Sequence, residues 1–117
     1  KRQVMGIGLA ATERHIYDSQ NGLPANIGLY QVKPPTYLDV PGEMGWAAVE
    51  EPDPQNPVGA KGIGEPVQGC GAAALLCAIS DALGGHLFNR APVVPDMIIN
   101  AVAEQPQSHT PLQVNTA

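Results

Sequence analysis

A stretch without any charged residue, from Val67 to Ser80, constrains the fold of this 117-residue chain more than any other feature. It is rich in alanine and predicts a helix from about Pro66 to Leu83, ended by Gly84 and Gly85. A surface helix has a polar face, and this one has almost none, so we expect it to be enclosed on most sides. A chain with few other elements can hardly enclose such a helix alone. The sequence therefore predicts that a partner, or the rest of a larger protein, covers it.

Composition and charge exclude several classes of function. The chain has five aromatic residues, thirteen glycines and twelve prolines, so a core of small aliphatic side chains between many turns is expected. Six Lys and Arg against eleven Asp and Glu give a formal net charge of −5, without a basic patch. This balance disfavours nucleic acid and anionic membranes as partners. No apolar run reaches the roughly 20 residues of a membrane-spanning helix.

The chain begins without an initiator methionine or a signal peptide, which we interpret either as a start within a longer protein or as the result of trimming. Cys70 and Cys77 are its two cysteines, and two turns of helix, about 10 Å, would prevent them from pairing with each other. We expect both to be small buried apolar residues. Free cysteines suit a reducing, cytoplasmic compartment.

The remaining segments predict an α+β fold with two or more strands and about three helices, because strands and helices do not alternate as in βαβ units. Residues 1–104 are expected to form the folded segment, and residues 105–117 a polar, flexible tail. Helices are expected over residues 3–13, 66–83 and 95–104, strands over 14–18 and 44–51, and irregular chain over 23–41.

The candidate functional site is the glycine-rich loop from Gly59 to Gly64, which ends in a single carboxylate, Glu65. Its glycines allow the backbone to approach a ligand closely. Pro66 fits the first turn of the following helix, so Glu65 lies at a helix N-terminus, where the dipole stabilises a negative charge. On the residues alone, Glu65 is either a helix-terminal acid or a functional carboxylate.

Other chemistry finds little support in the sequence. The loop lacks the Gly-Lys-Ser/Thr ending of a P-loop, and it lacks the preceding strand and glycine spacing of a dinucleotide-binding loop. His15, His86 and His109 are scattered without metal-ligand spacing. No serine or cysteine lies in a nucleophile-elbow context.

The run Gly-Ala-Lys-Gly-Ile-Gly-Glu-Pro over residues 59–66, followed by a small-residue helix, resembles a signature of the xanthine dehydrogenase and aldehyde oxidoreductase family. In that family it lies near the end of the molybdenum-binding large subunit. The resemblance covers roughly residues 3 to 103, and it departs from the family at residues 68–71. Matching segments occur in the family's order at residues 5–13, 16–18, 34–41, 49–52 and 90–98.

The resemblance implies that this chain is the C-terminal portion of a molybdenum hydroxylase large subunit. Such an enzyme oxidises an aldehyde or an N-heteroaromatic carbon with oxygen derived from water. Glu65 would act as general base toward a molybdenum-bound hydroxyl. Backbone N–H groups of four residues would contact the cofactor: Lys61, Gly62, Ile63 and Gly64.

The implied cofactor is molybdenum-molybdopterin, including its cytosine dinucleotide form. The implied partners are the remainder of the large subunit, domains or subunits that carry [2Fe–2S] clusters and FAD, and a small-molecule substrate. The residues also leave open a different class of function. In that alternative the chain is a non-catalytic interaction module that docks a partner through its apolar helix.

Overall fold

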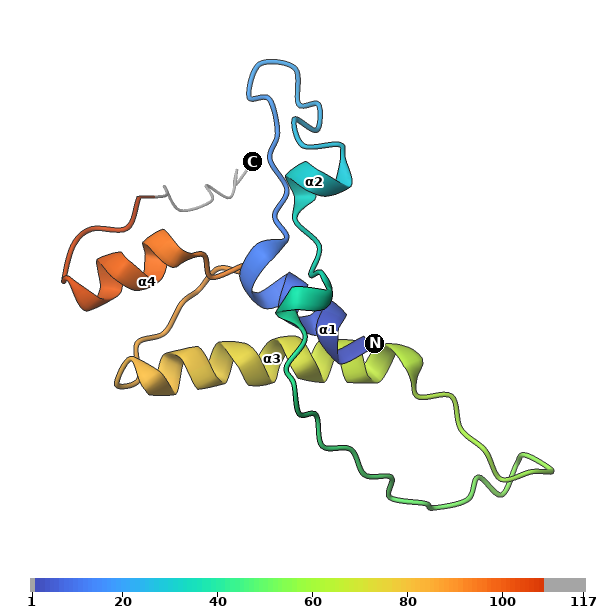
Figure 1. Cartoon of the computed structure of the whole chain (residues 1–117). Helices are drawn as coiled ribbons and strands as arrows, with labels where there is room; N and C mark the ends of the chain where they lie inside the picture. The colour runs from blue at the N-terminus through green and yellow to red at the C-terminus, as the bar shows by residue number, and fades with distance from the viewer. Residues whose placement is uncertain (1, 109–117) are drawn as a thin grey trace, which may run out of the picture.

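The computed structural model describes residues 2–108, and its elements gather around one long helix, α3 (Gly64–Ala82) (Figure 1). His109 and the rest of the predicted tail, residues 109–117, lie outside the described residues. Four further elements precede α3 and one follows it: helix α1 (Arg2–Ile7), the π-helical segment η1 (Gly8–Thr12), helix α2 (Leu29–Val32), the 3₁₀ turn η2 (Tyr37–Asp39) and helix α4 (Pro95–Val102).

The prediction of an α+β fold with two or more strands is wrong. Residues 2–108 form helices, turns and extended chain, with one isolated antiparallel bridge between Tyr17 and Pro24. The chain does reverse after residue 18, where the Asp18 N–H donates to the Leu23 carbonyl at 2.9 Å. In the described chain, no ladder of further residue pairs extends from this bridge, so neither side of the reversal forms a strand. A strand requires a hydrogen-bonded neighbour along its length.

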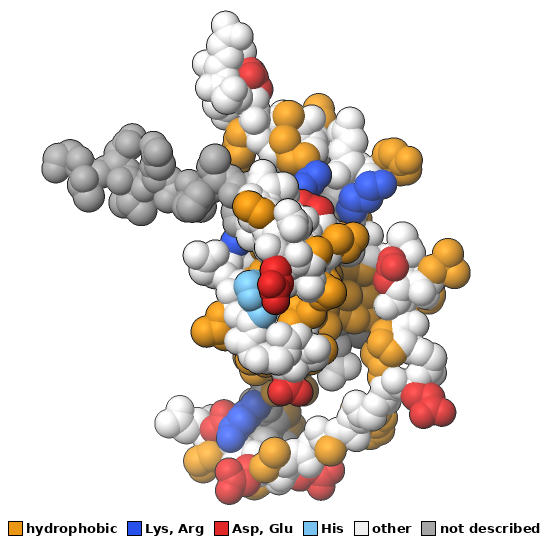
Figure 2. Space-filling view, turned by 90° about the vertical axis from the view of Figure 1, so that its left-hand side faces the viewer, with side chains coloured by type: hydrophobic (Ala, Val, Ile, Leu, Met, Phe, Trp, Pro, Cys, Tyr) orange, Lys and Arg blue, Asp and Glu red, His pale blue; other side chains and the backbone are white. Residues whose placement is uncertain are grey.

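The second predicted strand, residues 44–51, also has no partner in the described part of the chain. It belongs to a long excursion, residues 41–63, which we call the arm; it leaves the helices and returns at α3 (Figures 1 and 2). Every residue from 41 to 52 is exposed. Trp46 and Val49 are 89 % and 91 % exposed. The local sequence alone could not reveal that the described chain places no neighbouring strand beside these residues.

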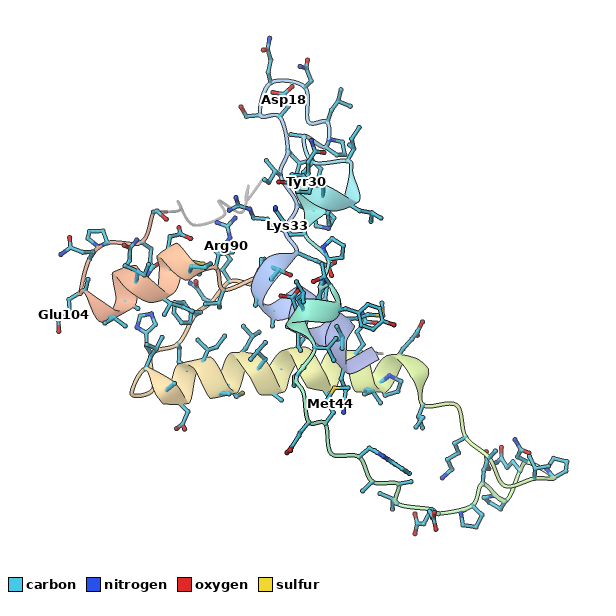
Figure 3. All side chains as sticks on the ribbon, viewed as in Figure 1. Asp18, Tyr30, Lys33, Met44, Arg90 and Glu104 are labelled. Carbon is cyan, nitrogen blue, oxygen red and sulfur yellow. The ribbon has the colours of Figure 1, made fainter. Side chains whose placement is uncertain are left out.

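The three predicted helices are present with shifted ends. Residues 3–13 correspond to α1 together with η1, and α3 begins two residues before the expected Pro66. Gly84 and Gly85 follow α3 at φ values of 67° and 92°, as expected for glycines at a helix end. Helix α2 was not predicted; Lys33 ends it at a φ of 63°, with its ammonium 4.2 Å from the centre of the Tyr30 ring (Figure 3).

Glycine permits the closest helix contact, which joins α1 to α3. A Cβ at Gly6 would lie 2.8 Å from the Ala72 nitrogen and 2.8 Å from the Gln68 oxygen. The buried apolar side chains of the described chain lie in η1, in α4 and just before α4: Ala10, Met97 and Val93. The Val93 N–H donates to the Ala10 carbonyl at 2.7 Å and so ties the segment before α4 to η1.

Helix α3 is not enclosed by the described chain, since none of its residues is buried. Helix α1 covers one side of it near its start. Cys70 and Cys77 are free and exposed, so the expectation of two buried cysteines is wrong for this chain. In residues 2–108 no helix is long and apolar enough to cross a membrane.

Candidate functional site

The tip of the arm, just before the glycine-rich loop, is closed by its own hydrogen bonds. The Asp53 N–H donates to the Gly59 carbonyl at 3.0 Å, and the Gly59 N–H donates to the Asn56 carbonyl at 2.9 Å. The Asn56 side chain donates to the Ala60 carbonyl at 2.9 Å. Gly59 has a φ of 66°, which glycine adopts without strain. This turn fixes where the loop begins.

The five candidate residues, 61–65, are consecutive. Lys61, Gly62 and Ile63 are exposed and lead into α3, whereas Gly64, which is half-buried, and Glu65, which is exposed, are its first two residues. Ile63 is the residue that precedes the helix, and no side chain caps it. The first N–H groups of a helix lack partners within the helix. Since Pro66 has no N–H, the free donors of the first turn come from Ile63, Gly64 and Glu65.

Glu65 is exposed, and it is the acidic residue in the first turn of α3. Lys61 places a positive charge four residues earlier on the same loop. A Cβ added at Gly62 would meet nothing within 4 Å, so the loop is open on that side. The arrangement offers backbone donors, one cation and one carboxylate to a ligand that approaches the helix N-terminus.

Helix α1 fixes the start of α3 close to Glu65. The contact of Gly6 with Gln68 lies one helical turn beyond Glu65. Because α1 contacts the backbone of α3 at this point, the helix that carries Glu65 is held in place near its start. The arm, which precedes Glu65 in the sequence, is largely exposed.

Among the described residues, no cluster of titratable side chains lies beside this loop. In residues 2–108 no group of three or more His, Cys, Asp and Glu side chains is arranged to hold a metal ion. His15 stacks on Tyr17 in the chain reversal between His15 and Asn26, which contains the Tyr17–Pro24 bridge and which we call the hairpin. His86 contacts Phe88 after α3. Neither of these histidines belongs to the loop.

One grouping escaped the sequence analysis. Arg14, Arg90, Asp96 and Ser108 line a common cavity near the start of α4. These residues come from three distant parts of the sequence, and no motif joins them. No local signal in the sequence could therefore have revealed them.

The proteins that this chain resembles are subunits of oxidoreductases, some of them named as molybdenum-binding. It is 38 % identical over 91 residues to a putative xanthine dehydrogenase molybdenum-binding subunit of Escherichia coli K12, covering 78 % of this chain and 12 % of that subunit. It is 33 % identical over 98 residues to the gamma subunit of the 6-hydroxypseudooxynicotine dehydrogenase complex of Paenarthrobacter nicotinovorans, covering 83 % of this chain and 12 % of the relative.

The crystal structure of quinoline 2-oxidoreductase from Pseudomonas putida 86 matches the fold with a TM-score of 0.78 and 32 % identity. This match covers 90 % of the present chain and 13 % of the solved one. No family profile matches the chain. The chain spans about 12 % of the length of the curated relatives it matches, so it is homologous to a segment of such oxidoreductase subunits.

Proposed function

We propose that this chain is the C-terminal segment of the molybdenum-binding subunit of an oxidoreductase of the xanthine dehydrogenase type. The observation that carries the proposal is the structural match to quinoline 2-oxidoreductase. The unmatched tenth of the 117 residues amounts to about 12, fewer than the 23 residues of the arm from 41 to 63. The match therefore includes part of the arm, although the described chain gives the arm no support.

The residues at the start of α3 fit a molybdenum-molybdopterin cofactor, which carries phosphate, including its cytosine dinucleotide form. Uncapped N–H groups at a helix N-terminus bind phosphate oxygens, and the open side of Gly62 leaves room for a large group. The N–H groups from Lys61 to Gly64 would hold this cofactor, and the Lys61 ammonium adds a complementary charge. When bound, the cofactor supplies the metal centre that accepts two electrons from the substrate.

Glu65 then serves as the general base. Its carboxylate takes the proton from the oxygen nucleophile as that oxygen attacks an aldehyde or N-heteroaromatic carbon. A general base must lie within hydrogen-bond reach of its proton, and α1 holds the helix that carries Glu65 within one turn of it. Positioning of this kind through packed helices is what a catalytic carboxylate requires. Partner domains or subunits that carry [2Fe–2S] clusters and FAD would supply the route by which the electrons leave.

Metal analysis of the native protein that contains this chain tests the proposal. We expect molybdenum and iron in the purified assembly, together with the visible absorbance of flavin and iron–sulfur centres. A colourless assembly without molybdenum, isolated with its partners intact, would contradict the proposal. It would instead support a non-catalytic module, a function favoured by the absence of buried residues along α3.

A further inference from the structure

A recessed cavity of about 190 Å³ lies where the base of the hairpin meets the start of α4. Its polar lining comes from three parts of the chain: Arg14 before the hairpin, Arg90 and Asp96 around the start of α4, and Ser108 after it. Figure 3 shows Arg90 on the segment that leads into α4. None of these residues belongs to the loop that carries Glu65.

The backbone around this cavity is fixed by specific hydrogen bonds. Asn26 is 8 % exposed, and its amide group donates to the Arg14 carbonyl at 2.6 Å. Its side-chain oxygen accepts the Ile16 N–H at 3.0 Å. Gln107 donates to the Met97 carbonyl at 3.2 Å, which places the neighbouring Ser108 against α4. These hydrogen bonds tie down the backbone at Arg14 and beside Ser108, whereas the side chains of Arg14 and Arg90 are exposed.

The charges in the lining favour an anion. Two guanidinium groups and one carboxylate leave a net charge of one positive. The Ser108 hydroxyl donates to Asp96 at 2.6 Å, and this hydrogen bond lowers the pKa of Asp96, with a smaller contribution from the charge of Arg14. The Asp96 carboxylate therefore already accepts a hydrogen bond within the protein, and the Ser108 hydroxyl partly compensates its negative charge. The guanidinium groups remain the donors that a ligand can meet.

The rest of the lining is apolar. Pro92, Val94 and Met97 form this part, and Met97 is 3 % exposed. The volume lies below the roughly 300 Å³ at which pockets for drug-sized ligands begin. A small molecule with one anionic end and a short hydrocarbon part matches both the size and the division into polar and apolar walls.

We propose that this cavity binds a small aliphatic carboxylate, whose carboxylate meets Arg14 and Arg90 and whose hydrocarbon part contacts Pro92 and Val94. Guanidinium groups bind carboxylates with paired, charge-assisted hydrogen bonds. Butyrate is a suitable probe. Inorganic phosphate tests for charge without the apolar contact, and n-butanol tests for the apolar contact without charge.

Isothermal titration calorimetry of the intact protein that contains this chain tests the proposal. We expect saturable butyrate binding that Arg90→Gln weakens at least about tenfold, because a charge-assisted pair is lost. Arg14→Gln should have a similar effect. Lys33→Gln removes an exposed positive charge outside the cavity, so it should leave butyrate binding unchanged. Rising salt should weaken binding in the unaltered protein.

The proposal would be overturned by the absence of saturable butyrate binding, by butyrate binding that Arg90→Gln leaves unchanged, or by n-butanol binding as tightly as butyrate. Phosphate binding as tightly as butyrate would show that the apolar wall contributes nothing and would also overturn it. Arg90 is exposed, so circular dichroism should confirm that Arg90→Gln retains its fold. Because the experiment measures binding and not turnover, its result does not depend on whether Glu65 is the general base.

Discussion

Replacement of Gly6 by alanine should loosen the contact between α1 and α3. The new Cβ would lie 2.8 Å from two backbone atoms of α3, the Ala72 nitrogen and the Gln68 oxygen. Backbone atoms within a helix cannot turn away as a side chain can, so the two helices must separate. Overpacking of this kind costs about 1–3 kcal/mol.

Gly69→Ala is the matched control. Gly69 lies in α3, and a Cβ there would meet nothing within 4 Å. Both substitutions gain about 1 kcal/mol of helix propensity, so this gain cancels when the two variants are compared. The difference in opening free energy between them should therefore be the overpacking cost. A cost of 1–3 kcal/mol corresponds to roughly 5- to 150-fold faster exchange of protected amides.

Hydrogen–deuterium exchange of peptides from α3, measured by mass spectrometry on the intact protein, provides the assay. Gly6→Ala should accelerate exchange relative to Gly69→Ala. Equal exchange in the two variants would refute the inferred backbone contact, and with it the argument that α1 fixes the start of α3 near Glu65.

Two further predictions concern the arm and α4. Gly59→Ala should open the turn at residues 53–59, because Gly59 has a φ of 66° and a Cβ there would lie 3.1 Å from that of Pro52; the cost should be about 1–2 kcal/mol. It should appear as faster amide exchange in that turn, with Gly45→Ala, which meets nothing within 4 Å, as the control that leaves exchange unchanged. The second prediction follows from the lowered pKa of Asp96, caused first by its hydrogen bond with Ser108. A carboxyl whose folded pKa is lowered stabilises the fold above its unfolded pKa, near 3.8, and this contribution is lost as the pH falls through the folded value. Ser108→Ala should raise the pKa of Asp96 in an NMR titration, and an unchanged pKa would contradict the assignment.

Helix α3 was predictable because its information is local. The charge-free run and the glycines that follow it define both ends of the helix within two residues. The position of Glu65 in the first turn follows from the same local pattern. The prediction of strands failed because residues 44–51 give no indication of whether a neighbouring strand is present.

The burial of a side chain, like the pairing of a strand, depends on parts of the protein that are distant in sequence. Cys70 and Cys77 have the surroundings of buried residues in sequence, yet α1 covers one side of α3 and leaves both exposed. Arg14 and Arg90 line one cavity, and the hydrogen bond from Val93 to Ala10 joins the two segments that carry them, which are about eighty residues apart in sequence. Only the folded chain reveals that contact.

The most direct test of the central claim is the rate of anaerobic single-turnover oxidation of an aldehyde or N-heteroaromatic substrate by Glu65→Gln. Glu43→Gln, the same substitution at an exposed residue of the arm, serves as the control, and both variants should carry molybdenum equal to that of the unaltered protein. If Glu65 is the general base, its loss should slow this step by about 10²- to 10⁴-fold, whereas Glu43→Gln should react normally. A near-normal rate in Glu65→Gln with full molybdenum would contradict the claim.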